Sequence, residues 1–154
     1  MNDIFTTSHV LLGLDVRTQD EAFAAAAAAA QRDGVTGSAA ELAAEFGARE
    51  AEVSTGLVDG FAIPHAKAAC ARRAALYYAR TVRPLPWETL DGQPVTHLLF
   101  LIAPAADADG AHLKMLAALA ACLMEDGFKA ALAAAEAPEE VVRVVGAGIA
   151  GIDL

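Results

Sequence analysis

Apolar and polar residues along this chain fall into blocks that predict strands separated by helices. Two early blocks are rich in alanine, and each opens on an S/T-x-x-E pattern: Thr18 with Glu21, and Ser38 with Glu41. In this capping box the paired side chains satisfy free amide groups at the start of a helix. Gly34 lies between the two blocks and provides a stop signal for the first. The pattern therefore predicts two consecutive helices.

Four other blocks favour strands. The segment VTHLLFLIAP has apolar side chains at nearly every position, which is typical of a central strand buried on both faces. The run AALYYARTV contains the aromatic and branched residues that strands prefer. VLLGLDV is a shorter candidate, and GLVDGFAIPH is a candidate that Gly60 interrupts. These segments cover residues 10–16, 56–65, 74–82 and 95–104.

The remaining third of the chain has a helical pattern. A helix is expected after Gly110, and two shorter helices are expected over residues 128–136 and 138–146, the last of them starting at Pro138. Strands that alternate with helices predict the α/β class, with one sheet covered on both sides. A chain of 154 residues fits one domain, so residues 1–154 are expected to form a single domain.

Composition and charge limit the partners and the compartment. Twenty acidic and 11 basic residues give a formal charge of −9, which argues against nucleic acid and favours a partner with a basic or apolar face. No uncharged stretch approaches the ~20 apolar residues that span a bilayer, and the first ten residues lack the pattern of a secretory signal. Cys70 and Cys122 lack a disulfide or C-x-x-C spacing. A cytoplasmic protein without a membrane insertion is expected.

The segment GFAIPHAK, residues 60–67, is the strongest candidate for a working site. Pro64 removes a backbone donor and pushes Ile63 out of the helical region, so the chain is expected to be extended here and then to turn sharply. His65 is then expected at the end of a strand with room around its imidazole, and Lys67 lies just beyond. Packing alone does not explain this arrangement.

The other three histidines each have an ordinary structural interpretation. His9 is expected to be a partly exposed residue near the amino terminus, and His97 to be a satisfied histidine within a strand. His112 stands at the start of a helix, where a solvent-facing polar residue and a functional residue are both common. The sequence leaves those two interpretations of His112 open.

Several chemistries lack their sequence pattern. There is no H-x-x-H, H-E-x-x-H or Cys/His cluster for a metal, no G-x-S-x-G for a serine hydrolase, and no glycine-rich phosphate loop for a nucleotide. Neither cysteine has the C-x-x-x-x-x-R spacing of a phosphocysteine enzyme. Histidine remains as the nucleophile, which requires one unprotonated ring nitrogen and a hydrogen bond that fixes the other. No metal or other cofactor is expected.

A histidine that carries a phosphoryl group needs donors around it, because phosphoryl transfer depends mainly on positioning and charge stabilisation. A second imidazole, a guanidinium, hydroxyl groups and amides at a helix start can all donate to phosphoryl oxygens. His112 and the amides after Gly110 meet this description. Arg49 and Thr55, upstream of His65, are further candidates.

These residues resemble a known family. REAEVSTGLVDGFAIPHAK, residues 49–67, resembles the signature of the enzyme IIA domain of the fructose/mannitol class in the bacterial phosphoenolpyruvate-dependent sugar phosphotransferase system. The similarity continues through residues 87–104 and 112–120, in the same order as in the family. The resemblance implies a mixed five-stranded sheet flanked by helices.

The resemblance also implies a phosphocarrier. His65 would accept a phosphoryl group from phosphorylated HPr and pass it to a cysteine of enzyme IIB. His112 would hydrogen-bond the phosphoryl group or the partner, and Arg49 would be the basic residue beside the site. Thr55, a candidate from its place upstream of His65, is expected to support phosphoryl binding. The segment PLPWETLDGQPV favours the fructose-like branch. A regulatory, nitrogen-related module that controls partners by its phosphorylation state and a scaffold without activity remain as alternatives.

Overall fold

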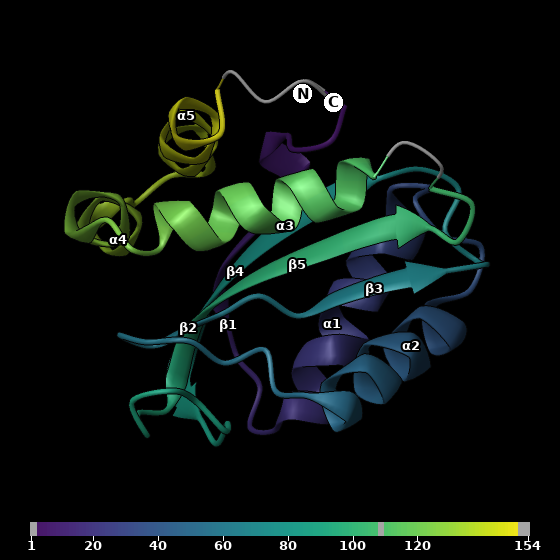
Figure 1. Cartoon of the computed structure of the whole chain (residues 1–154), viewed down its shortest axis with the longest axis horizontal. Coiled ribbons are helices and arrows are strands. Elements are labelled where there is room, and N and C mark those ends of the chain that lie inside the picture. The colour runs from purple at the N-terminus through teal and green to yellow at the C-terminus, as the bar shows by residue number, and fades with distance from the viewer. Residues whose placement is uncertain (1–2, 108–109, 151–154) are drawn as a thin grey trace.

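A computed structural model describes residues 3–107 and 110–150 as one mixed, five-stranded sheet with helices on both faces (Figure 1). The strand order is β1-β4-β5-β2, and β3 also pairs with β5. β1 (Val10–Leu14) runs parallel to β4 (Ala75–Leu85), and β4 runs antiparallel to β5 (Val95–Pro104). β2 (Phe61–Ala62) and β3 (His65–Ala68) both lie parallel to β5. The expected α/β class is confirmed.

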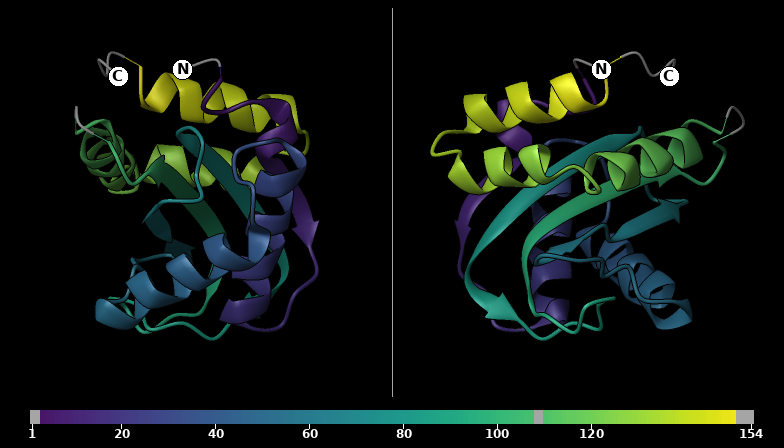
Figure 2. Two further views of the ribbon diagram at one scale, coloured as in Figure 1. Left: turned by 90° about the vertical axis from the view of Figure 1, so that its right-hand side faces the viewer. Right: turned by 60° about the vertical axis from the view of Figure 1, so that its left-hand side comes forward.

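Two groups of helices cover the two faces of the sheet (Figures 1 and 2). The first two α-helices pack on one face, and the last three cover the other. The central strand is therefore buried from both sides, as its continuous apolar sequence predicts. In chain order the helices are η1 (Thr7–His9), α1 (Gln19–Arg32), α2 (Ala39–Glu52), α3 (Ala111–Cys122), α4 (Asp126–Ala134) and α5 (Pro138–Gly148).

Side chains of β5 alternate between the two hydrophobic cores. Leu98, Phe100 and Ile102 belong to the core under α1 and α2. Leu99 and Leu101 belong to the core under α3, α4 and α5. All five side chains are at most 2% exposed, so this strand is a rigid base for whatever pairs with its edge.

Both predicted capping residues stand at helix starts. Thr18 Oγ1 accepts a hydrogen bond from the Glu21 amide at 3.1 Å, and Ser38 Oγ accepts one from the Glu41 amide at 3.2 Å. The return bond of the first box differs from the standard pattern, because the Glu21 carboxylate accepts from the Arg17 amide. The two consecutive helices are confirmed.

The prediction for the segment before His65 was wrong in its details. Only Phe61 and Ala62 form a strand there, and a new strand begins at His65 where the sequence predicted a strand end and a sharp turn. Pro64 explains the interruption, because it has no amide to donate to the neighbouring strand. Its carbonyl still accepts from the Leu101 amide at 2.9 Å, which keeps the chain beside β5. His65 is thus held by pairing on both sides of the proline.

Gly56 provides a test of the packing between the loop before β2 and the loop before β5. A Cβ atom at this position would lie 2.2 Å from the Glu88 carbonyl oxygen and 2.7 Å from Thr89 Cγ2. Gly56→Ala is therefore expected to lower the free energy of unfolding by about 2 kcal/mol, measured by urea denaturation. The control Gly146→Ala has open space around its Cβ and should gain about 0.5 kcal/mol as a helical alanine. An unchanged urea midpoint for Gly56→Ala would contradict this packing.

Candidate functional site

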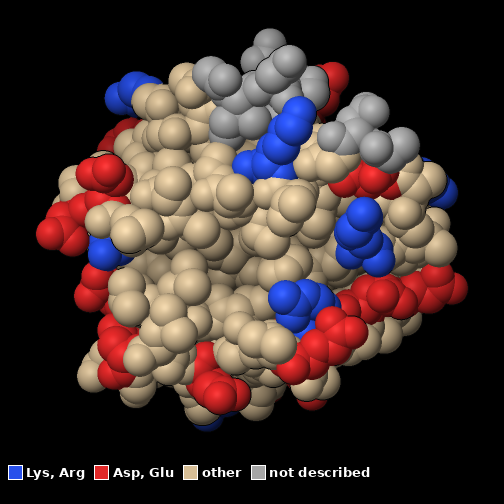
Figure 3. Space-filling view, in the orientation of Figure 1, with Lys and Arg blue, Asp and Glu red and all other residues tan. Residues whose placement is uncertain are grey.

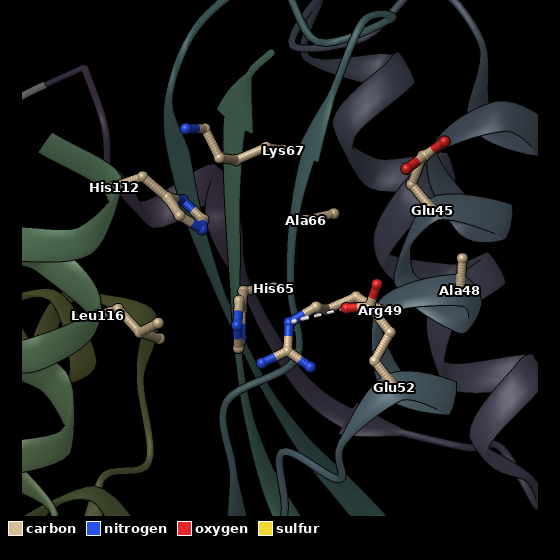
Figure 4. A pocket seen from close by; sticks show the side chains of 9 residues that line it. All are labelled: Glu45, Ala48, Arg49, Glu52, His65, Ala66, Lys67, His112 and Leu116. Atoms are coloured by element: carbon tan, nitrogen blue, oxygen red, sulfur yellow. Dashed lines mark ion pairs between the residues drawn. The ribbon is translucent and has the colours of Figure 1, made fainter. Parts of the chain in front are cut away.

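A cavity of about 380 Å³ opens beside β3, between α2 and α3 (Figure 4). It brings together segments that lie far apart in the sequence. Arg49 and Glu52 come from α2, His65 and Lys67 from β3, and His112 and Leu116 from α3. The predicted residues His65, His112 and Arg49 therefore share one cavity.

His65 is half-buried in the wall of the cavity, with one ring nitrogen fixed. Its Nδ1 lies 2.8 Å from the Ile63 carbonyl oxygen. Because a carbonyl can only accept, Nδ1 carries the hydrogen, and Nε2 of the neutral ring keeps a lone pair. Burial and the nearby Arg49 guanidinium lower the pKa of His65 from its usual 6.5. The ring is therefore mostly neutral at neutral pH, which is the state a nucleophile requires.

His112 lies next to His65, with ring centroids 5.7 Å apart and planes inclined by 50°. Burial lowers its pKa to about 4, and the neighbouring His65 and Lys67 act in the same direction. His112 Nδ1 is buried and has no hydrogen-bond partner among the described residues. A neutral imidazole can donate from one nitrogen and accept at the other, so His112 can serve a neighbouring group without adding a fixed charge.

The amide at the start of α3 has a partner. The His112 amide donates to Asp107 Oδ2 at 3.0 Å, so an acidic side chain caps this helix. This amide was predicted from the sequence to be one of the donors to a phosphoryl group. In the structure it already donates its hydrogen to the Asp107 carboxylate. The rest of the preceding loop, residues 108–109, lies outside the described residues.

Arg49 and Lys67 supply positive charge at the cavity. Arg49 is about one-third exposed; its Nη1 donates to the Val53 carbonyl at 3.0 Å, and its Nε lies 4.0 Å from a Glu52 carboxylate oxygen. Lys67 is exposed two residues after His65, so both side chains leave the same face of β3. Figure 3 shows this side of the molecule: basic groups lie on the face itself beside an uncharged patch, and acidic groups lie mainly along its margins.

Thr55 lies outside the cavity wall. It is buried, its hydroxyl donates to Glu50 Oε1 at 2.6 Å, and its amide donates to Glu50 Oε2 at 2.8 Å. Trp87 Nε1 donates to the same Glu50 Oε2 at 3.2 Å. The Glu50 carboxylate thus accepts three hydrogen bonds, two from Thr55 and one from Trp87. No role was predicted for Glu50 from the sequence, where its only signal is its place beside Arg49.

The two remaining histidines belong to the cores. His9 was predicted to be partly exposed, and this was wrong: it is 2% exposed, stacks on Tyr77 and hydrogen-bonds the Leu76 carbonyl, because the amino-terminal segment folds over β4. His97 is a satisfied core histidine, as predicted. The Tyr78 hydroxyl oxygen and His97 Nδ1 lie 2.6 Å apart and share a hydrogen bond.

Within residues 3–107 and 110–150, none of the helices is long and apolar enough to cross a membrane. The same ranges contain no group of three or more His, Cys, Asp or Glu side chains arranged to hold a metal ion.

The family follows from comparison with known proteins. The family described as "Phosphoenolpyruvate-dependent sugar phosphotransferase system, EIIA 2" matches residues 3–147. The chain is 37% identical over 97 residues to the fructose-specific EIIABC component of Bacillus subtilis, which covers 63% of this chain. It spans only 15% of that protein's length. The chain therefore belongs to this EIIA family, whose members are phosphotransferase components of the system.

Solved structures agree with this assignment. Nitrogen regulatory protein IIA-Ntr from Neisseria meningitidis superposes with a TM-score of 0.86 and 31% identity, covering 93% of this chain and 97% of its own. The fold also matches enzyme IIAMtl from Escherichia coli in a complex with phosphorylated enzyme IIBMtl, with a TM-score of 0.77, 15% identity and coverage of 93% and 97%. Relatives named for fructose transport and relatives named for nitrogen regulation thus both resemble this chain.

Proposed function

We propose that residues 1–154 form one EIIA domain that carries a phosphoryl group on Nε2 of His65. The main support for this proposal is the hydrogen bond from His65 Nδ1 to the Ile63 carbonyl, which leaves the lone pair of Nε2 free to attack. That lone pair attacks the phosphorus of phosphorylated HPr, and the phosphorus–nitrogen bond of HPr breaks as the new one forms. In the second step a cysteine thiolate of enzyme IIB attacks the same phosphorus, and His65 returns to its neutral form.

Three side chains at the cavity are suited to stabilise the transferring group. Arg49 and Lys67 supply positive charge for the phosphoryl oxygens, and the neutral ring of His112 supplies a donor. Only a few donors surround the site, and Glu52 offsets part of the positive charge near Arg49. Such a site holds the phosphoryl group loosely enough to release it, which suits a relay. Thr55 supports the site from the layer behind it.

The proposed partners are HPr as donor and enzyme IIB as acceptor. The Escherichia coli complex supports the second, because in it a protein of this fold is bound to a phosphorylated IIB. An uncharged patch lies beside basic groups on this face, and such a surface suits docking of another protein (Figure 3). We place the chain in fructose-type uptake, on the strength of the Bacillus relative and of the segment at residues 84–95.

A regulatory role is the second candidate. It is favoured by the similarity to the Neisseria nitrogen regulatory protein, which extends over 93% of this chain. In that role the phosphorylation state of His65 would control a partner protein, and no cysteine of an enzyme IIB would take the group. The first step, phosphorylation by phospho-HPr, is common to both roles.

One reconstituted assay tests the shared step and separates the two roles. The chain is incubated with phosphoenolpyruvate, enzyme I and HPr, and then with a fructose-type enzyme IIB. We expect one acid-labile phosphate per chain, followed by its transfer to enzyme IIB. Transfer that stops at the phosphorylated chain favours the regulatory role. A chain that takes up no phosphate contradicts both.

The rate of phosphoryl acceptance is expected to fall as the pH drops and to level off at neutral pH. Only neutral His65 has a free lone pair on Nε2, and its pKa is lowered from 6.5 by burial. Half of the maximal rate should therefore be reached below pH 6.5. Single-turnover rates from pre-formed phospho-HPr, beside an NMR titration of His65, measure this. A midpoint above neutral pH in both experiments would contradict the environment described for His65.

A further inference from the structure

We propose that Glu50 is a positioning residue. It holds His65 in the Nδ1–H tautomer by fixing the position of the Ile63 carbonyl, which accepts that hydrogen. This inference rests on the proposed function, since the tautomer matters only if Nε2 is the nucleophile. Glu50 does not line the cavity, so its hydrogen bonds reach His65 only through other groups. Burial lowers the pKa of His65, and the negative charge of Glu50 opposes this directly. Three steps of hydrogen bonding connect it to the His65 ring.

The first step is the carboxylate itself. Glu50 stands in the last turn of α2, where the helix dipole disfavours negative charge. Three donors compensate for this placement: the amide and hydroxyl of Thr55 and the indole of Trp87. Hydrogen bonds to an ionised acceptor are the stronger kind. Glu50 therefore fixes Thr55, the second residue after the C-cap of the helix, and ties it to Trp87 in the loop before β5.

The second step runs from Thr55 to Ile63. The Ile63 amide donates to the Thr55 carbonyl at 3.1 Å, and the Leu57 amide donates to the Phe61 carbonyl at 2.9 Å. An isolated antiparallel bridge between Gly56 and Ala62 lies between these two bonds. The segment that Glu50 holds is thus paired with the segment that leads into His65.

The third step is the bond to the ring. Both backbone groups of Ile63 are engaged: its amide by Thr55 and its carbonyl by His65 Nδ1. Pro64 follows directly and restricts the backbone of Ile63 further. The position of the Ile63 carbonyl decides which nitrogen of His65 carries the hydrogen. Loss of Glu50 removes the first of these three hydrogen-bonding steps. The other tautomer of His65 then becomes possible, in which Nε2 is protonated and cannot attack.

Two variants of the full chain test this inference, Glu50→Ala and Glu50→Gln. The readouts are the ¹⁵N chemical shifts of the His65 ring, which report the tautomer, and the single-turnover rate of phosphorylation by phospho-HPr. In the wild type we expect the Nδ1–H tautomer alone. In Glu50→Ala we expect a mixture of tautomers and a fall in the maximal rate of about 10-fold, the scale known for partners that orient metal-binding histidines. The phospho-HPr concentration for half-maximal rate should change little.

The conservative variant and a control separate positioning from general destabilisation. Glu50→Gln keeps an amide oxygen for the donors, so the tautomer and most of the rate should return. Glu41→Gln makes the same chemical change at an exposed position of the same helix and should match the wild type. If Glu50→Ala does not fold, Thr55→Val removes one of the donors and should show a smaller shift in the same direction.

The outcome that overturns the inference is a folded Glu50→Ala with the wild-type tautomer and the wild-type rate. A lower melting temperature with an unchanged tautomer also overturns it, since Glu50 would then be structural only. Failure of the proposed function looks different: wild-type chain would not be phosphorylated by phospho-HPr, while the ¹⁵N shifts of His65 would still answer the question about Glu50.

Discussion

His65→Gln is expected to abolish uptake of the phosphoryl group from phospho-HPr. The variant removes Nε2 of His65. Among the described residues that line the cavity, only His65 has its Nδ1 fixed by a backbone carbonyl, and glutamine offers no nucleophile in its place. The measurement is the label incorporated from phosphoenolpyruvate in the presence of enzyme I and HPr. Wild type should take up one acid-labile phosphate per chain, and the variant none. The half-buried position of His65 predicts that the variant remains folded.

A cysteine variant is the control for this experiment. Cys70 is a half-buried thiol that does not line the cavity, and Cys70→Ser should keep the full label. Label that persists in His65→Gln would show that another residue carries the phosphoryl group. The acid stability of that label would then show whether a thiol carries it.

The second large effect is expected for His112→Ala, in the step after phosphorylation. The label should still form on His65, but its transfer to enzyme IIB should slow by about 10- to 100-fold. The reason is the loss of a neutral donor beside the phosphoryl group, 5.7 Å from the His65 ring between centroids. Rapid-quench measurement of transfer from the pre-phosphorylated chain follows this step alone.

A glutamine at the same position sharpens the test. His112→Gln keeps an N–H donor without a titrating ring, and it should transfer faster than His112→Ala. Transfer at the wild-type rate in both variants would refute the role given to His112. The ring is neutral at working pH because its pKa is lowered to about 4, so neither variant removes a charge.

Local patterns predicted much of the fold. The unbroken apolar run at residues 95–104 identified the central strand, and the patterns at Thr18 and Ser38 identified two helix starts. Both signals depend on neighbours in the chain, and a sequence shows these directly. The burial of His9 depends on how the amino terminus folds over a distant strand, and a local pattern does not show that.

The site was predictable to a similar degree. His65, His112 and Arg49 were selected from the sequence, since each offers a reactive or charged group at a distinctive place. The structure brings them to one cavity, and their roles in phosphoryl transfer stay predictions. The capping of α3 by Asp107 and the contacts of Glu50 were not predicted. Hydrogen bonds between a side chain and a loop depend on the exact path of the backbone, so the sequence shows only that the groups exist.

The most direct test of the account is the position of the phosphoryl group on the ring. Phosphorylated chain, labelled with ¹⁵N at its histidines, can be examined by ¹⁵N and ³¹P NMR. The account predicts that phosphorus is bonded to Nε2 of His65 and that Nδ1 still carries its hydrogen toward the Ile63 carbonyl. Phosphorus on Nδ1 of His65, or on His112, would contradict it.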